Sequence, residues 1–251
     1  MTQPIENVFV IHVSEGYESR QVHIDKHLPE RNILNYEYIL DGDIKDLSPN
    51  ILMSFFKCSK ITDAEKSCFY KHYLACKKVV EFNLEHALIF EDDVLINVGF
   101  NESLLSILTE LEGESNYLVN LEDAYLSVPY RFRKPNKKVY LANYTKMCGA
   151  YFIDNVAANR LVKFIDNNGA TLPIDIYQSE YRDEIRLNLY WSEPSLVHQG
   201  SKSGLFESSV NEEKQGLIQS IRYRLKCLHK KYIWSHMNKR VIRVFENVAK
   251  Y

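Results

Sequence analysis

The stretch Ala87-Leu-Ile-Phe-Glu-Asp-Asp-Val94 joins four apolar residues directly to three consecutive carboxylates. A short, unbroken apolar run is typical of a strand buried on both faces, as in a sheet that has helices on both sides. Ligands of such sheets gather at the carboxyl ends of the strands. We therefore predict an α/β fold whose ligand site includes Glu91, Asp92 and Asp93.

Three neighbouring carboxylates repel one another, and the repulsion destabilises a fold unless a cation compensates for it. Mg²⁺ and Mn²⁺ prefer oxygen ligands, and they commonly bind one or two carboxylates together with the phosphates of a substrate. The pattern thus favours a divalent ion bound at this cluster of three carboxylates. A solvated acidic turn after a strand is the alternative explanation.

The charge of the chain is distributed unevenly. The 251 residues carry a net charge of −2, but residues 215–251 contain nine Lys or Arg and one acid, a net charge of +8, so the preceding residues sum to −10. We predict one domain over residues 1–212 and a separate basic tail over residues 213–251. The acidic body argues against nucleic acid as a partner.

Cysteine usage and hydropathy bear on the compartment. The five cysteines form no CxxC pair, and an odd, scattered set is typical of reduced thiols in a cytosolic protein. The first residues have neither a basic flank nor an apolar core, so we expect no signal peptide. No apolar run approaches the roughly 20 residues that span a bilayer.

Alternating strand and helix patterns follow one another along the chain. We expect a second acidic strand end at Glu122 and Asp123, after the strand 117–121, and a helix that begins at the capping box Thr62–Glu65. A loop is expected over 194–203, and Asn155 is expected to cap a helix. The predicted strands cover 8–13, 36–40, 87–93, 117–121, 147–153 and 187–191, and the predicted helices cover 20–28, 62–82, 102–112 and 156–165.

The helix that begins at the capping box carries Cys68, His72 and Cys76 on one face. A Cys-His-Cys metal face would lack a fourth ligand of standard spacing, so the cysteines are better explained as small core residues. His72 is either a hydrogen-bonded core histidine or a site residue that points at the acidic cluster. The sequence leaves both explanations open.

Apolar residues in the tail recur at steps of three, four and seven from Leu217 to Phe245, which predicts one or two amphipathic helices with basic faces. Such helices are typical of peripheral binding to an anionic membrane. The alternatives are a helical pair packed on the domain, or a contact between two copies of the chain in a homodimer.

Taken together, these segments resemble glycosyltransferase family 25, which includes bacterial lipooligosaccharide galactosyltransferases and the collagen galactosyltransferase domain. The resemblance covers about residues 7–210. It departs from the family pattern at His12-Val13, where the family usually has Asn-Leu, and at Ala64, Lys66-Ser67 and Lys71. The segments that carry it are Val10–Val13 with Arg20, Glu65–His72, Ala87–Asp93, Gly149–Ile153, Pro173–Asp175 and His198-Gln199.

The resemblance implies a GT-A fold, which is a Rossmann-like α/β/α sandwich with a mixed central sheet, here followed by the helical tail. It implies a UDP-sugar donor and Mn²⁺, or Mg²⁺, held by Glu91 and Asp93 with His198 as an additional ligand. Asp175 is our first choice as catalytic base, with Glu122 and Asp123 as alternates. The residues implied in donor binding are Val10, His12, Arg20, Glu65, His72, Asp92, Gly149 and Gln199.

The function implied is inverting transfer of a hexose, galactose before glucose, from a UDP-hexose to a lipooligosaccharide or lipopolysaccharide acceptor. Such an enzyme is expected in the bacterial cytoplasm, peripheral at the inner face of the cytoplasmic membrane. Two other classes remain open: a metal-dependent phosphotransferase or hydrolase that uses the same acids, and a catalytically inactive nucleotide-sugar-binding module.

Overall fold

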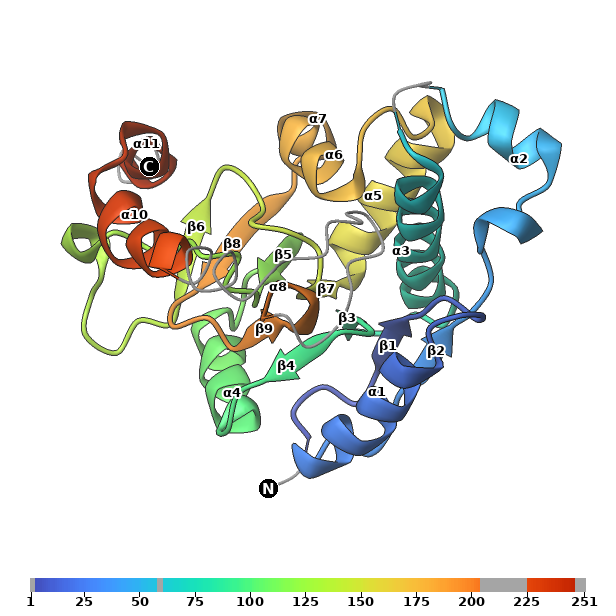
Figure 1. Cartoon of the computed structure of the whole chain (residues 1–251). Helices are drawn as coiled ribbons and strands as arrows, with labels where there is room; N and C mark the ends of the chain where they lie inside the picture. The colour runs from blue at the N-terminus through green and yellow to red at the C-terminus, as the bar shows by residue number, and fades with distance from the viewer. Residues whose placement is uncertain (1–2, 58–60, 204–224, 247–251) are drawn as a thin grey trace.

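The computed structural model describes residues 3–57, 61–203 and 225–246. A seven-stranded mixed sheet in the order β2-β1-β3-β7-β5-β8-β6 forms its centre (Figure 1). β1 is parallel to β2 and β3, β5 is parallel to β8, and β7 is antiparallel to both of its neighbours. The strands are β1 (Val8–Ile11), β2 (Glu37–Ile39), β3 (His86–Glu91), β5 (Tyr117–Asn120), β6 (Val139–Ala142), β7 (Ala150–Asp154) and β8 (Asn188–Ser192).

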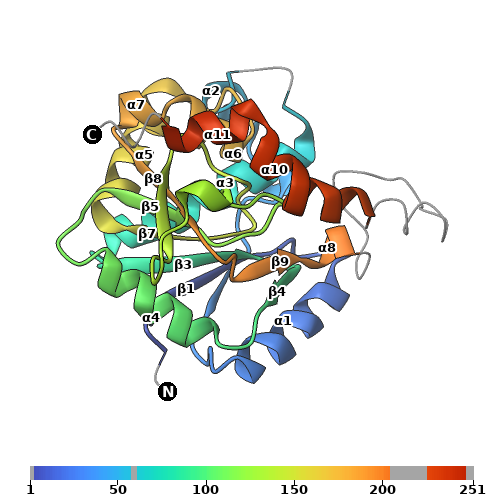
Figure 2. The same ribbon diagram turned by 90° about the vertical axis from the view of Figure 1, so that its left-hand side faces the viewer.

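Helices cover both faces of this sheet (Figure 2). On one face α3 and α5 pack over alternate strand residues such as Ile89 and Tyr151, whereas α1 and α4 pack over Leu88 and Phe90 on the other. The predicted α/β sandwich with a mixed central sheet is therefore confirmed. The helices of the body are α1 (Glu18–Glu30), α2 (Pro49–Ser54), α3 (Asp63–Glu81), α4 (Phe100–Glu110), α5 (Asn155–Asn168), α6 (Ile174–Glu180), α7 (Arg182–Ile185) and α8 (Gly200–Ser203), with 3-10 turns η1 (Ile44–Asp46) and η2 (Tyr130–Phe132).

The capping box of α3 is confirmed, because Thr62 and Glu65 exchange side-chain and backbone hydrogen bonds. The cap expected at Asn155 is wrong. Asp154 caps α5 by accepting from the N–H of Ala157, and the Asn155 amide instead donates to the carbonyls of Val79, in the last turn of α3, and Leu84, just after it. The acidic side chain one residue earlier has the right reach for the helix N-terminus.

The loop expected over 194–203 contains regular structure. β9 (Val197–Gln199) pairs antiparallel with β4 (Val94–Ile96), which directly follows the acidic turn, and α8 continues from β9. Segments of three residues are too short to show an alternating pattern, so this small sheet was not predicted. The pairing sets His198 and Gln199 beside the carboxyl end of β3.

The described part of the tail packs on the domain next to β6 and β8 (Figure 1). It contains helical residues 225–237, which include the π-helical turn η3 (Lys230–Trp234) and α10 (Ser235–Met237), and then α11 (Lys239–Glu246). Val241, Val244 and Phe245 are buried against a cluster that includes Trp191. The predicted boundary at residue 212 lies outside the described residues. Among the helices described, none is both long and apolar enough to cross a membrane.

Lys71 occupies a position inside the fold that few lysines occupy. Its side chain is 1% exposed, and its ammonium group lies 3.0 Å from a carboxylate oxygen of Asp43 and also donates to the carbonyls of Ile39 and Leu40. Asp43 accepts from the backbone N–H and hydroxyl of Ser14. This network joins the loops that follow β1 and β2 to helix α3, next to the predicted site.

We expect Lys71→Met to lower the free energy of unfolding by about 3–5 kcal/mol, because it leaves the carboxylate of Asp43 buried without its cation. Urea denaturation at pH 7 measures the loss. The matched control is Lys78→Met on the same helix, which removes a partly exposed ion pair with Glu37 and should cost less than about 1 kcal/mol. Equal losses in the two variants would contradict the assigned role of Lys71.

Candidate active site

The carboxyl ends of β1, β3, β5 and β8 lie at one edge of the sheet, because these strands run in the same direction. The acidic residues predicted from the sequence follow β3 and β5 at this edge. Asp92, Asp93, Glu122 and Asp123 are all buried, and Glu91 is partly exposed. Buried carboxylates require compensating bonds, so the partners of each one show what it is available to do.

Asp92 is engaged through both of its carboxylate oxygens. His12 Nδ1 lies 2.7 Å from Oδ2, and the Arg20 guanidinium donates to Oδ1 at 2.7 Å. All three side chains are buried. These bonds tie the end of β1 and the first turn of α1 to the acidic turn, so Asp92 orders the site and has little capacity left for a metal ion.

Asp93 is less completely satisfied. Its carbonyl accepts from the N–H of Gly200 at 2.6 Å, and Oδ2 accepts from the N–H of Ser201 at 3.1 Å. Its other carboxylate oxygen is buried without a hydrogen-bond partner among the described residues. Burial, and then the neighbouring charge of Glu91, raise the pKa of Asp93. A cation at this oxygen would remove both penalties.

Gly149 brings β7 close to two other site residues. Its N–H donates to Glu122 at 3.0 Å, while the Gln199 amide donates to Glu91 at 3.2 Å. A Cβ at position 149 would lie 2.5 Å from the Gln199 amide nitrogen and 2.8 Å from a carboxylate oxygen of Glu122. Only glycine therefore fits here without displacing these two side chains.

Asp123 is held by two basic side chains from distant parts of the chain. His198 Nδ1 lies 3.1 Å from Oδ2, and Lys231 of the tail donates to the same oxygen at 2.6 Å. Burial alone would raise the pKa of Asp123, but the bonds from His198 and Lys231 outweigh it and lower the pKa to about 2. Nothing in the sequence distinguishes Lys231 from the other lysines of the basic amphipathic helix, so its role was not predicted.

Lys146 is a second residue that the sequence analysis missed. It is buried, donates to the Ser195 hydroxyl at 3.1 Å, and its ammonium group lies 4.9 Å from the Trp191 ring centroid. Burial lowers its pKa to about 8, against the opposing charges of Glu193 and Asp123. It adds positive charge next to the Asp123 end of the site.

Asp175 lies in the first turn of α6 and is partly buried. One carboxylate oxygen accepts from the N–H of Ile176 at 2.9 Å, and its carbonyl accepts from the Thr145 hydroxyl. Burial raises the pKa of the thiols of Cys68 and Cys148, and the negative charge of Asp175 raises it further. Asp175 thus faces the same group of side chains as Glu91, whose carboxylate lies 3.8 Å from the Cys68 sulfur.

Three other predicted donor-binding residues have structural contacts. The Val10 side chain is fully buried in the core beneath α1 and α4. The Glu65 carboxylate accepts from the backbone N–H and the hydroxyl of Thr62 at the start of α3. His72 is fully buried, with Nδ1 3.0 Å from the Tyr151 hydroxyl and Nε2 3.7 Å from Glu91. Of these three, His72 is the one that reaches the acidic group.

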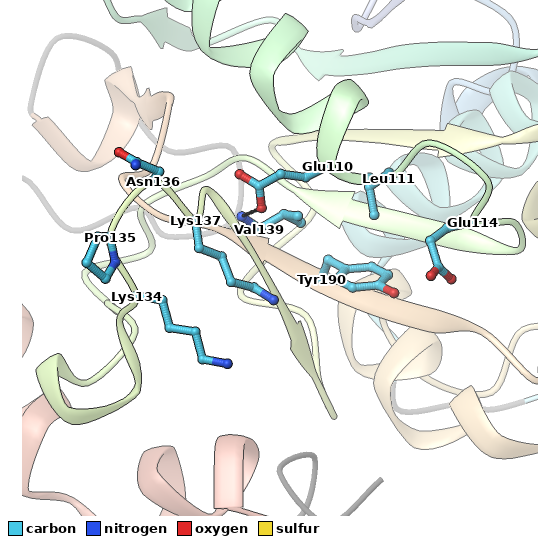
Figure 3. Close-up of a pocket in the computed structure, with 9 residues that line it drawn as sticks. All are labelled: Glu110, Leu111, Glu114, Lys134, Pro135, Asn136, Lys137, Val139 and Tyr190. Carbon is cyan, nitrogen blue, oxygen red and sulfur yellow. Dashed lines mark hydrogen bonds between the residues drawn. The ribbon is translucent and has the colours of Figure 1, made fainter.

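Two cavities lie in different parts of the molecule. The larger, about 430 Å³, is formed between the end of α4 and the loop before β6, and it contains none of the predicted site residues (Figure 3). In this view Lys134 and Lys137 project from the loop on one side, and Tyr190 and Glu114 lie on the other. The smaller, about 210 Å³, is lined by Leu95, Glu122, Asp123, Ala124, Tyr125, His198 and Gln199. We take the smaller cavity as part of the site because it is lined by the clustered acids.

The residues after β5 also show backbone strain. Ala124 and Tyr125 follow Asp123 with φ values of 43° and 56°, in a region that side chains other than glycine, asparagine and aspartate rarely adopt. Strain of this kind persists where surrounding contacts fix the backbone, and it is common at ligand sites. Both residues line the smaller cavity.

The acidic edge of the sheet fits a hard divalent ion. Asp93 offers an orphaned, buried carboxylate oxygen, and the neighbouring Glu91 adds a second carboxylate. Oxygen donors of this type suit Mn²⁺ and Mg²⁺. His198 lies at the same edge, on Asp123.

A family model described as glycosyltransferase family 25 (LPS biosynthesis protein) matches residues 6–178, more than half of the chain. The chain belongs to glycosyltransferase family 25. The resemblance found in the sequence is thereby confirmed. The matched range includes both acidic strand ends, Gly149 and Asp175, and it ends before His198 and the tail.

Two relatives show how far the likeness extends. The lipooligosaccharide biosynthesis protein lic2B of Haemophilus influenzae is 33% identical over 104 residues, which cover 38% of this chain and 36% of lic2B. Procollagen galactosyltransferase 2 of Mus musculus is 25% identical over 157 residues, which cover 55% of this chain and 24% of that protein. The matches thus span about a third and a quarter of these relatives.

Two solved structures are similar to the chain. A glycosyltransferase involved in the glycosylation of the major capsid of PBCV-1 matches with a TM-score of 0.45 and 10% identity, covering 88% of this chain and all of that one. A197 from STIV matches with a TM-score of 0.41 and 16% identity, covering 76% and 82%.

The bond from Lys231 to Asp123 predicts a pH-dependent stability. Folding lowers the pKa of the Asp123 carboxyl from about 3.9 in the unfolded chain to about 2. Such a group stabilises the fold at any pH above its unfolded pKa. This stabilisation is lost as the pH falls through the folded pKa. We expect Lys231→Met to raise that folded pKa and to lower the free energy of unfolding at pH 7 by about 1 kcal/mol.

Urea denaturation from pH 7 to pH 2 measures the effect, and the difference from the unmodified chain should disappear toward the acid end. Lys226→Met, at an exposed position of the same helix, is the matched control and should show no such difference. A constant difference across the whole range would show that Lys231 acts through packing and not through the charge of Asp123.

Proposed function

We propose that the chain is a metal-dependent, inverting hexosyltransferase that uses a UDP-sugar, with galactose favoured and glucose next, to extend a lipooligosaccharide or lipopolysaccharide acceptor. The observation that carries the proposal is the convergence of the two acidic strand ends with His198, Gln199 and Gly149 at one edge of the sheet, in a member of family 25. A GT-A site uses this edge for its donor.

In this proposal Glu91 and Asp93 hold Mn²⁺ or Mg²⁺, with His198 as an additional ligand. The bound ion would neutralise the charge that develops on the leaving diphosphate. Arg20 and His12 fix Asp92 and thereby the shape of the acidic turn. Because Gly149 has no side chain, it leaves room for the Glu122 and Gln199 side chains, which a Cβ at this position would contact too closely.

An acceptor hydroxyl that attacks the anomeric carbon from the face opposite the leaving group must give up its proton to a base. Asp123 is poorly suited, because the partners that lower its pKa to about 2 also occupy one of its oxygens. Glu122 is fully buried and accepts from Gly149. Asp175 is partly exposed and stands on a helix at the same site, so it stays our first choice.

The experiment that tests the class is release of UDP from a panel of UDP-sugars with Mn²⁺, with and without a truncated lipooligosaccharide acceptor. Acceptor-dependent release from one donor, abolished by a chelator, supports the proposal and identifies the sugar. Release of free sugar or inorganic phosphate without acceptor would instead indicate a hydrolase. Binding of UDP without turnover would indicate an inactive module, and no binding of UDP would overturn the proposal.

We expect Asp175→Asn to lower the transfer rate by at least about 100-fold while UDP binding stays within about twofold, because general-base catalysis typically contributes 10²–10⁴-fold. Asparagine retains the oxygen that accepts from Ile176, so the helix start is preserved. Asp183→Asn, at an exposed position on α7, is the control. If Asp175→Asn turns over at nearly the rate of the unmodified chain, Asp175 is not the catalytic base, and Glu122 is the next residue to substitute.

We also propose that the tail binds an anionic membrane surface, which places the enzyme at the inner face of the bacterial cytoplasmic membrane next to a lipid-linked acceptor. The described tail is docked on the domain through one apolar face, yet Leu225, Leu228 and Met237 remain more than half exposed. Lys239 and Arg240 are exposed close by. An exposed apolar stripe with basic neighbours is suited to the headgroup region of a bilayer.

We expect the double variant Lys239→Glu, Arg240→Glu to bind phosphatidylglycerol vesicles at least about thirtyfold more weakly, since each lost basic residue contributes about 1 kcal/mol near an anionic surface and the two glutamates add repulsion. Vesicle sedimentation measures binding, and zwitterionic vesicles should bind neither the unmodified chain nor the double variant. The control is Lys26→Glu, Lys163→Glu, which makes the same charge change at exposed positions on the body. Equal binding by both variants would contradict membrane contact through the tail.

A further inference from the structure

Three side chains from α3 and β3 direct ligand-type atoms at one point inside the domain. The sulfur of Cys68 lies 3.8 Å from Oε1 of Glu91, and Nε2 of His72 lies 3.7 Å from the same oxygen. All three atoms lie within 4.8 Å of one another. The four-residue spacing puts Cys68 and His72 on one helix face, and the strand alternation that directs Ile89 toward α3 directs Glu91 there too.

His72 gives an independent indication of a ligand. It is completely buried, and its Nε2 has no hydrogen-bond partner among the residues that the structure describes. Its Nδ1 lies 3.0 Å from the Tyr151 hydroxyl. When Nδ1 carries the proton and donates it to Tyr151, Nε2 presents its lone pair toward Glu91. Metal-bound histidines are commonly oriented in this way by a partner on the other ring nitrogen.

The spacing of these atoms is close to that of a tetrahedral zinc site. Typical bond lengths of about 2.0–2.3 Å predict separations of about 3.4 Å between nitrogen and oxygen ligands and about 3.6 Å between sulfur and oxygen ligands. The observed 3.7 and 3.8 Å exceed these by only a few tenths of an ångström.

We propose that Cys68, His72 and Glu91 form a Zn²⁺ site with a fourth position left for water or another ligand. A thiolate, a carboxylate and a neutral imidazole together balance the charge of Zn²⁺, which is the condition for burying an ion in the domain. The thiolate and the imidazole favour Zn²⁺ over Mn²⁺ and Mg²⁺, which prefer oxygen ligands. This site is therefore chemically distinct from the oxygen site at Asp93.

The two sites share Glu91. Its Oε1 faces Cys68 and His72, while its Oε2 accepts from Gln199. Burial, and then the charges of Glu91 and Asp175, raise the pKa of the Cys68 thiol, so binding of the ion must release that proton. If Glu91 also takes part in donor binding, Zn²⁺ at this site inhibits sugar transfer, a consequence that rests on the proposed function.

Titration of the metal-free full-length chain with Zn²⁺ alone, against a chromophoric chelator, tests the site. We expect one ion per chain, and Co²⁺ in its place should give a thiolate-to-metal charge-transfer absorption band. Cys68→Ser and His72→Gln should each weaken binding by at least about 100-fold, the upper end of the effect of removing an outer-shell partner. Cys76→Ser, at another buried cysteine of α3 outside the group, is the matched control and should bind normally.

Zinc binding that survives Cys68→Ser, or a Co²⁺ complex of the unmodified chain without the charge-transfer band, would overturn the proposal. The Co²⁺ spectrum needs no variant, so it decides the question even where a substitution prevents folding. These measurements use neither donor nor acceptor. A negative result would therefore contradict the zinc site without bearing on the proposed transferase function. Inhibition of transfer by Zn²⁺ that Cys68→Ser relieves would add the link between the two sites.

Discussion

The burial of negative charge at one edge of the sheet is the constraint on which the rest of the site depends. Asp92, Asp93, Glu122 and Asp123 are each at most 5% exposed, and Glu91 is adjacent to them. Each buried carboxylate would destabilise the fold by several kcal/mol without compensation. His12 and Arg20 compensate Asp92, and Lys231 and His198 compensate Asp123. Asp93 and Asp123 each keep one carboxylate oxygen without a hydrogen-bond partner among the described residues, but burial and the charge of Glu91 raise the pKa of Asp93, whereas the basic partners of Asp123 lower its pKa.

This distribution separates residues that order the site from residues that have capacity for a ligand. A carboxylate with both oxygens engaged, such as Asp92, fixes neighbouring loops, whereas one with a raised pKa and an orphaned oxygen, such as Asp93, gains most from a bound cation. The buried ion pair between Lys71 and Asp43 has a similar role, because it holds the loops that follow β1 and β2 against α3. Lys71 is one of the positions at which the chain departs from the usual pattern of its family, and it has a structural task.

The main elements of the fold were predictable from the sequence, because long apolar runs and a capping box act locally. The strand at Ala87–Phe90 and helix α3 begin and end within a few residues of the predicted limits. The β4–β9 pair was not predictable, since segments of three residues carry no periodicity. The approach of Lys231 to Asp123 was not predictable either, because it depends on how the tail docks and not on the residues around Lys231.

The tail connects these points, because it joins the domain through two different interactions. Val241, Val244 and Phe245 bury an apolar face against Trp191, which fixes α11, while Lys231 delivers one charge to Asp123 from the preceding helix. A tail attached by packing alone would leave Asp123 bonded to His198 but without the ammonium group of Lys231, and its pKa would be higher. The docking of the tail therefore lowers the pKa of a site residue and brings a positive charge next to it, so any surface that binds the exposed face of 225–237 acts on a segment already in contact with the site.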